Sequence, residues 1–119
     1  MGEVIALGCG LVGKFVIRKL IERGFSVIVV DLEVPEKIKS LNGVTSIEGD
    51  VFEVIESLPR KKVVVNMLPG RIGNQIRPYL LESGHNVIDL AFTLEDPIEH
   101  LEIAKHNNCV LLWDVGIAP

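Results

Sequence analysis

The sequence predicts an α/β protein: a doubly wound parallel sheet of strand order 3-2-1-4-5-6 with a layer of helices on each face. Two observations predict this fold. Short apolar runs rich in Val and Ile alternate with amphipathic stretches along the 119 residues, which is typical of strands buried on both faces. A glycine-rich stretch at 8–13 follows the first of these runs, where such folds turn sharply from their first strand into their first helix.

Six apolar runs have the length and composition of buried strands. Val and Ile are frequent in most of them, and five of the six are followed directly by Gly or Asp, residues that favour turns, while the run at 63–66 itself ends in Asn66. The expected strands cover residues 4–7, 27–30, 44–48, 63–66, 87–88 and 110–113.

The stretches between the first four runs have helical spacing. The first helix is expected over 11–23, before Gly24, with a buried face of Val12, Phe15, Val16 and Leu20. A short helix is expected over 35–41, because it has a proline at its start and a glycine just after its end. The third runs from 51 to a proline at 59, and its expected buried face is Val51, Val54, Ile55 and Leu58.

The last two helices are marked by prolines. Ile72, Ile76, Tyr79 and Leu80 share one face of the fourth helix. Since proline lacks an N–H group, Pro78 leads us to expect that the regular helix starts only at about Asn74. For the fifth helix, we expect Thr93 as the cap, Asp96 and Pro97 in the first turn, and a buried face of Ile98, Leu101 and Ala104.

Composition narrows the functional classes. A chain of 119 residues is expected to form one domain, and its net charge of −4 argues against a nucleic-acid partner. Cys9 and Cys109 form no C-x-x-C pair, so both are interpreted as small apolar residues in a reducing cytoplasm, without zinc. We expect no signal peptide, because the N-terminus runs straight into the first expected strand, and no apolar run reaches the ~18 residues that a membrane span needs.

The glycine stretch has the spacing G-x-G-x-x-G. Gly8 permits the tight turn, Gly10 lets a pyrophosphate approach the backbone, and Gly13 lets the helix pack close to its strand. The free N–H groups near Leu11 and Val12, at the helix N-terminus, would then bind the diphosphate. This is the fingerprint of a Rossmann dinucleotide-binding domain.

Cofactor choice depends on the residue that ends the second strand. Asp31 lies 18 positions past Gly13, where a carboxylate accepts hydrogen bonds from both hydroxyls of the adenosine ribose. Its charge would repel a 2′-phosphate, and no Arg occurs from 32 to 39, where Lys37 and Lys39 are interpreted as helix surface. The sequence therefore favours NAD over NADP.

The remaining cofactor contacts are expected where the later strands end. Asp50 can bind the exocyclic amine of adenine or cap the next helix, and it can do both. The segments 67–70 and 90–92 end the fourth and fifth strands and should border the nicotinamide ribose. The predicted cofactor site comprises Gly8, Gly10, Leu11, Val12, Gly13, Asp31, Leu32, Asp50, Val51, Met67, Leu68, Pro69 and Leu90.

The sequence assigns no catalytic residue and no metal site. Asp89 and Asp114 end the last two strands, where a carboxylate is more often a loop anchor than a substrate contact. We place the three histidines on helix surfaces or turns, without chemistry, and interpret the basic cluster before the fourth strand as a solvated turn; these residues are His85, His100, His106 and Arg60-Lys61-Lys62.

Taken together, these segments resemble the N-terminal domain of the saccharopine dehydrogenase family, especially its lysine dehydrogenase-like members. The resemblance spans essentially the whole chain. The first two of its motifs are generic to Rossmann domains and the last four are more specific: VIALGCGLVG, GDV, VVVNMLPG, NVIDLAF, LEDPIEHLEIAKHNN and LLWDVGIAP.

The resemblance implies hydride transfer between a nicotinamide and the CH–NH group of an amino acid or secondary amine. It also implies a second domain after Pro119, which binds the amino-acid substrate and mediates a homodimer. Residues 1–119 would then be the dinucleotide-binding domain of a truncated chain, with the general base in the missing domain or shared with the loop around Asp114.

Two alternatives remain. Potassium-transport regulatory domains of the RCK/TrkA type also carry G-C-G-x-x-G, an aspartate after the second strand and G-D after the third, and they bind NAD as a sensor. The LPG, DLAF and DVGIAP segments are not needed by such sensors, and these segments favour the dehydrogenase. The other alternative is a non-catalytic Rossmann module that has lost its partner domain.

Overall fold

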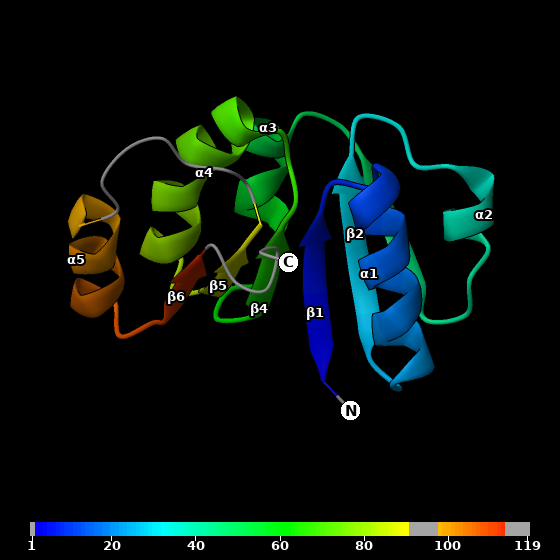
Figure 1. The fold of residues 1–119 in the computed structure, drawn as a ribbon, viewed down its shortest axis with the longest axis horizontal. Coiled ribbons are helices and arrows are strands. Elements are labelled where there is room, and N and C mark those ends of the chain that lie inside the picture. Colours follow the sequence, from blue (N-terminus) through cyan, green and yellow to red (C-terminus); the bar gives the residue numbers. More distant parts are fainter. Residues whose placement is uncertain (1, 91–97, 114–119) are drawn as a thin grey trace, which may run out of the picture.

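A six-stranded, all-parallel sheet forms the centre of the molecule (Figure 1), as the computed structural model shows for residues 2–90 and 98–113. Its strand order is β3-β2-β1-β4-β5-β6, which confirms the predicted topology. Each strand lies within about one residue of its expected position. The strands are β1 Glu3–Leu7, β2 Ser26–Asp31, β3 Val44–Glu48, β4 Val63–Asn66, β5 Asn86–Asp89 and β6 Leu111–Trp113.

Helices cover both faces of the sheet, which gives the expected three layers. One apolar core joins the sheet to α1 (Leu11–Glu22) and α2 (Glu36–Lys39). A larger core on the other face joins it to α3 (Val51–Val54) with the 3₁₀ turn η1 (Ile55–Ser57), α4 (Gly70–Glu82) and α5 (Ile98–His106). Within the described part of the chain, no helix is long and apolar enough to span a membrane.

The face of α1 that contacts the sheet differs in part from the predicted one, since Leu20 packs against the core as expected but two other residues do not. Gly13 and Ile17 are buried, whereas Val12 is exposed and Phe15 is 62% exposed. The cause is a close backbone approach: a Cβ added at Gly13 would lie 2.5 Å from the carbonyl oxygen of Gly8. Contact at Gly13 turns the helix so that Phe15 points to solvent, where its ring lies 5.6 Å from Lys19 Nζ.

Helix α4 begins four residues earlier than expected and contains Pro78 in its interior. The expectation of a start near Asn74 was wrong because packing offsets the roughly 3 kcal/mol cost of an interior proline. The inward face of the helix is Gly73, Ile76, Arg77, Leu80 and Leu81. Ile72 is partly exposed and Tyr79 is 55% exposed, so their predicted burial was also wrong.

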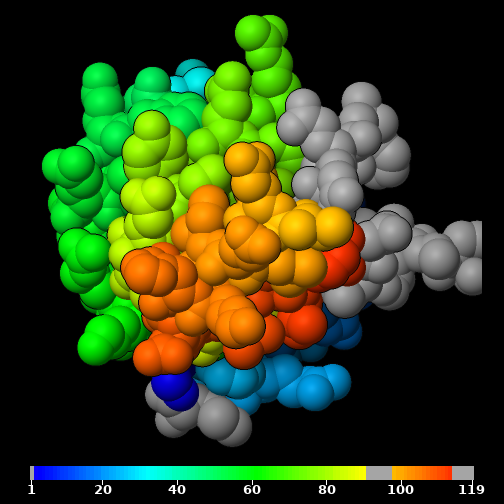
Figure 2. All heavy atoms as spheres, turned by 90° about the vertical axis from the view of Figure 1, so that its left-hand side faces the viewer, coloured from blue at the N-terminus to red at the C-terminus, as the bar shows by residue number. Residues whose placement is uncertain are grey.

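Helix α5 lies at the β6 end of the sheet, where it fills the foreground of Figure 2 with β6 beside it. Ala104 is buried as predicted, but Ile98 and Leu101 are exposed. Ile103 packs against the core in their place, since a helix at the end of a sheet has less surface to cover. The expected capping residues Thr93, Asp96 and Pro97 lie outside the described residues.

His85 was predicted to be a surface residue, but it is almost completely buried. It lies between α4 and β5, and its Nδ1 accepts a hydrogen bond from the backbone N–H of Lys62 at 3.1 Å. Its Nε2 is buried and has no hydrogen-bond partner among residues 2–90 and 98–113. Desolvation, the largest cause, lowers the pKa of this imidazole below its usual value.

Candidate dinucleotide site

The glycine loop joins β1 to α1 in the predicted strand–turn–helix context. Gly8 has a φ of +96°, and a Cβ there would lie 2.8 Å from the carbonyl oxygen of Met67. Gly8 therefore makes the turn, and Gly13 makes the close helix contact described above. A Cβ added at Gly10, by contrast, would meet no atom of the described residues within 4 Å. The space over Gly10 is open to a ligand.

The N-terminus of α1 faces this open space. No side chain caps the helix at Gly10, and the first N–H groups of a helix have no partner within it. A cavity of about 440 Å³ lies here. It is lined by Gly8, Gly10, Leu11, Val12, Gly13, Asp31, Met67, Leu68 and Pro69. An anion in this cavity would meet both free N–H groups and the positive end of the helix dipole.

Asp31 is oriented by the backbone around it. Its Oδ2 accepts the backbone N–H of Cys9 at 2.8 Å, and its Oδ1 accepts that of Leu32 at 2.7 Å. Each carboxylate oxygen accepts two hydrogen bonds, so Oδ1 retains capacity for a hydroxyl. Oδ2 also receives the Cys9 thiol at 3.4 Å, a weak bond that a hydroxyl can replace.

Of the two lysines of α2, one is paired with a carboxylate and the other is exposed. Lys39 Nζ lies 3.1 Å from Glu48 Oε1. A hydrogen bond from the Val34 backbone N–H and the contact with Lys39 lower the pKa of Glu48. Lys37 is exposed on α2.

The Cys9 thiol, which contacts Asp31, stays protonated. Burial is the largest cause that raises its pKa, and together with Asp31 it brings that pKa to about 11.

A second, more apolar cavity of about 230 Å³ adjoins the first and shares Asp31, Leu68 and Pro69 with it. Its other lining residues are Val30, Leu32, Gly49, Asp50, Val51, Phe52 and Ile72. Asp50 caps α3, because its Oδ1 accepts the backbone N–H of Phe52 at 2.9 Å. The capping role foreseen for Asp50 is therefore confirmed.

All but one of the predicted site residues line these two cavities. The exception is Leu90, which follows β5 and donates its backbone N–H to Asn66 O at 2.9 Å. The prediction missed four lining residues: Val30, Gly49, Phe52 and Ile72. Phe52 follows Asp50-Val51 and could have been found as an exposed aromatic residue at a helix start, whereas Ile72 was assigned to a buried helix face.

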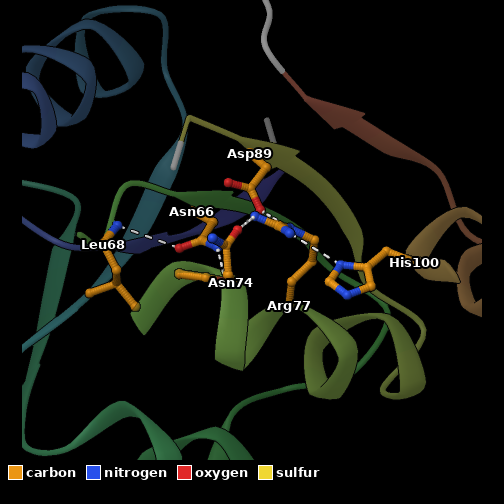
Figure 3. Close-up of polar contacts among 7 residues, drawn as sticks. Asn66, Leu68, Asn74, Arg77, Asp89 and His100 are labelled. Carbon is orange, nitrogen blue, oxygen red and sulfur yellow. Dashed lines mark hydrogen bonds and ion pairs between the residues drawn. The ribbon is translucent and has the colours of Figure 1, made fainter. Parts of the chain in front are cut away.

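A buried polar network, drawn in Figure 3, contacts the backbone of Leu68, a residue that lines both cavities. Asp89 is fully buried and forms an ion pair with Nε of Arg77, which is 2% exposed. Asn66, also fully buried, donates from Nδ2 to Asp89 Oδ2 at 3.1 Å. Asp89 therefore has a structural role, in line with the expectation that a carboxylate at a strand end is more often an anchor than a substrate contact. Nothing in the sequence pattern pointed to Asn66 or Arg77.

The other candidate residues contribute no chemistry to these cavities. His100 accepts a hydrogen bond at Nδ1 from Arg77 Nη1 at 3.1 Å, and His106 is exposed at the end of α5. Asp114 and the predicted contacts at 91–92 lie outside the described residues. Within residues 2–90 and 98–113, no three His, Cys, Asp or Glu side chains form a group that could hold a metal ion.

Comparison with known proteins identifies the fold. No protein-family model and no curated protein matches the sequence. Among solved structures, a candidate oxidoreductase from Bacteroides fragilis NCTC 9343 superposes with a TM-score of 0.77 at 16% identity, over 95% of this chain and 36% of that one. Homoserine dehydrogenase from S. aureus gives 0.68 at 19% identity, over 98% and 33%. Shikimate dehydrogenase from Aquifex aeolicus gives 0.62 at 20% identity, over 95% and 42%.

These similarities define the class of the molecule. The chain has the Rossmann fold, in the arrangement that the matching dehydrogenase structures share. It spans about a third of the length of the first two of these proteins.

Proposed function

We propose that this chain is the NAD(H)-binding domain of an oxidoreductase. The observation that carries the proposal is the pair of adjoining cavities that share Asp31, one at the open glycine loop and one apolar. The first cavity suits a pyrophosphate and the second suits an adenine ring. Asp31 at their junction suits the ribose between these groups.

The residues of the site suit NAD better than NADP. A 2′-phosphate on the ribose would lie against the Asp31 carboxylate, which repels it. Lys39 could offset this repulsion only by leaving Glu48, 3.1 Å away. The bound nicotinamide would supply the hydride acceptor or donor, and the protein would supply its position.

The substrate class rests on the sequence resemblance. The VVVNMLPG, NVIDLAF and LLWDVGIAP segments resemble saccharopine dehydrogenase-like enzymes, and we propose that the substrate is an amino acid or secondary amine oxidised at its CH–NH group. The matches to homoserine and shikimate dehydrogenases are compatible with an oxidoreductase but do not favour this substrate. The general base would belong to a further domain or to a partner.

Titration with NADH and NADPH, followed by fluorescence, tests the cofactor. We expect NADH to bind at least tenfold more tightly, a difference of about 1.4 kcal/mol. The substitution Asp31→Ala should weaken NADH binding and narrow the difference in affinity between NADH and NADPH. It removes both the contact with the ribose and the repulsion of the 2′-phosphate. Lys37→Ala, on exposed α2, is the control and should leave both affinities unchanged. Equal affinities for NADH and NADPH in the starting protein would contradict the proposal.

A sensor role is the second candidate, because the same loop and Asp31 would serve a regulatory domain of the RCK/TrkA type. The two functions differ in the consequence of dinucleotide binding. A sensor would change its association with a membrane transporter on binding NADH, whereas an oxidoreductase domain would support NAD reduction together with its substrate-binding part. A pull-down with and without NADH separates the two functions when it is paired with an amine-oxidation assay of the chain joined to the substrate-binding domain that the resemblance implies.

A further inference from the structure

The wall shared by the two cavities is fastened from behind by side chains that no ligand can reach. Leu68 and Pro69 form this wall between β4 and α4. Asn66 Oδ1 accepts the backbone N–H of Leu68 at 3.4 Å, and Asn66 Nδ2 donates to Gly73 O at 3.1 Å. The backbone N–H of Gly73 in turn donates to Pro69 O at 2.7 Å. One amide side chain therefore ties both ends of the wall.

Asn66 is itself fixed by charge. Asp89 Oδ2 accepts from Asn66 Nδ2 and from Arg77 Nε, so one carboxylate oxygen joins the two side chains. Arg77 also donates from Nη2 to Asn74 Oδ1 at 2.6 Å and from Nη1 to His100 Nδ1 at 3.1 Å. Figure 3 shows these side chains converging from β4, β5, α4 and α5.

A buried ion pair is weak evidence for stability, since desolvation offsets much of its attraction. The effect of the Arg77–Asp89 pair is geometric, because the planar guanidinium group of Arg77 fixes the direction as well as the distance of its hydrogen-bond partners. On the opposite side, the glycine loop packs closely against the same segment, because a Cβ added at Gly8 would lie 2.8 Å from Met67 O and 3.3 Å from Leu68 N. Small displacements of the wall would therefore change the width of both cavities.

We propose that Arg77 is a positioning residue of the dinucleotide site, which acts through Asp89 and Asn66 on the Leu68–Pro69 wall. The proposal rests on the function proposed above. Asn66, Asp89 and Arg77 are at most 2% exposed, so they shape the cavities without contacting the cofactor. The contact with His100 brings α5 into the same network.

The test compares Arg77→Met with Ile76→Val, a matched control on the same helix. Ile76 is fully buried and lines neither cavity, so its truncation should lower stability while leaving the hydrogen bonds of Asn66, Arg77 and Asp89 in place. NADH affinity is measured by fluorescence at a temperature where circular dichroism shows each variant folded. We expect about a tenfold rise in Kd for Arg77→Met, about 1.4 kcal/mol, and no change for Ile76→Val.

A second readout requires no ligand. In ¹H–¹⁵N spectra, the Leu68 amide should shift and exchange faster with solvent in Arg77→Met, but not in Ile76→Val. If NADH binds neither variant nor the starting protein, the proposed cofactor function fails, while the Leu68 amide still tests the positioning of the wall. An unchanged Leu68 amide in folded Arg77→Met would overturn the positioning role, and so would a shifted amide with unchanged NADH affinity.

Arg77→Met could prevent folding, because it removes the Arg77 guanidinium from the fully buried Asp89 carboxylate. Two further variants keep the proposal testable. Arg77→Lys retains the charge but not the fork, and we expect a Kd between those of the starting protein and Arg77→Met. Arg77→Met combined with Asp89→Asn removes both charges, and it should fold with the weakened NADH binding of the single variant. Starting-protein affinity in this double variant would contradict the proposal.

Discussion

The three glycines of the loop have different physical tasks, although the sequence motif treats them alike. Gly8 needs a positive φ, and Gly13 allows backbone contact with the carbonyl of Gly8. Gly10 has a φ of −69°, which any residue can adopt, and open space where a Cβ would lie. Gly8 and Gly13 therefore serve the fold, and Gly10 is the position at which function can be tested alone.

We predict that Gly10→Val keeps the fold and abolishes NADH binding, because the isopropyl group fills the space proposed for the pyrophosphate. Gly13→Ala should instead destabilise the domain by about 1–3 kcal/mol, the usual cost of overpacking, because its methyl group meets Gly8 O at 2.5 Å. Thermal unfolding and NADH titration of both variants check this contrast. A folded Gly10→Val that binds NADH normally would show that the loop is not the site.

At the residue scale, the sequence predicted the lining of the cavities better than their support. The glycine spacing and Asp31 at the end of a strand are local signals, since they can be recognised within a short stretch of sequence. Arg77, Asn66 and His85 gave no such signal. Their burial depends on partners 12 to 23 residues away, and only the folded chain brings these together.

At the scale of elements, strand positions were predictable and helix orientations were less so. A buried parallel strand is apolar throughout, so its position is clear without knowing which face each residue occupies. Helices α1 and α4 carry apolar residues on more than one side, as exposed Phe15 and Tyr79 show. Which side packs inward is decided by close contact at Gly13 and by the buried partner of Arg77.

We expect the connection between α4 and β5 to be sensitive to acid, because the His85 imidazole holds it. His85 Nδ1 accepts the Lys62 N–H, Asn86 N donates to Lys62 O, and Lys61 N donates to Ser83 O, so the start of β4 is fastened to this turn. The pKa of folded His85 is below the usual 6.5, chiefly through burial and also through repulsion by Arg60. As the pH falls, His85 is therefore protonated in the unfolded chain before it is protonated in the folded chain.

We predict that the contribution of His85 to the free energy of unfolding is constant above about pH 6.5. It should fall as the pH drops from there towards the lower pKa of His85 in the folded chain. His85→Asn offers an oxygen to the Lys62 N–H without titrating, so it should flatten this dependence while lowering stability at neutral pH. Thermal unfolding at a series of pH values measures the effect. Exposed His106→Gln is the control, and the same flattening there would contradict the assignment to His85.

At the scale of the whole molecule, the site lies where the sheet changes direction. The chain runs outward from β1 to β3 and then returns to place β4 on the other side of β1. The first turns of α1 and α4 therefore separate at the carboxyl ends of β1 and β4, as in other doubly wound sheets. This placement follows from connectivity, so it was predictable once the alternation of strands and helices was established.

One consequence concerns catalysis by these 119 residues alone. The two cavities share Asp31, Leu68 and Pro69, while the side chains of Leu11 and Leu32, which also line them, remain largely exposed. Hydride transfer needs an opposing surface that orients the substrate against the nicotinamide, and such positioning can contribute ~7–11 kcal/mol to catalysis. None of the described residues that line the cavities is assigned as a general base.

We therefore predict that the 119-residue chain binds NADH but does not reduce NAD with lysine, saccharopine or related amines. Adding the substrate-binding part that the sequence resemblance implies should produce turnover, because the second surface then excludes water and holds the amine carbon against the nicotinamide. Absorbance of NADH at neutral to alkaline pH, with a panel of amino acids, measures this for both forms. Robust turnover by the short chain would show that one domain suffices to position the substrate. NADH binding that alters a transporter, without turnover by any longer form, would instead support the sensor.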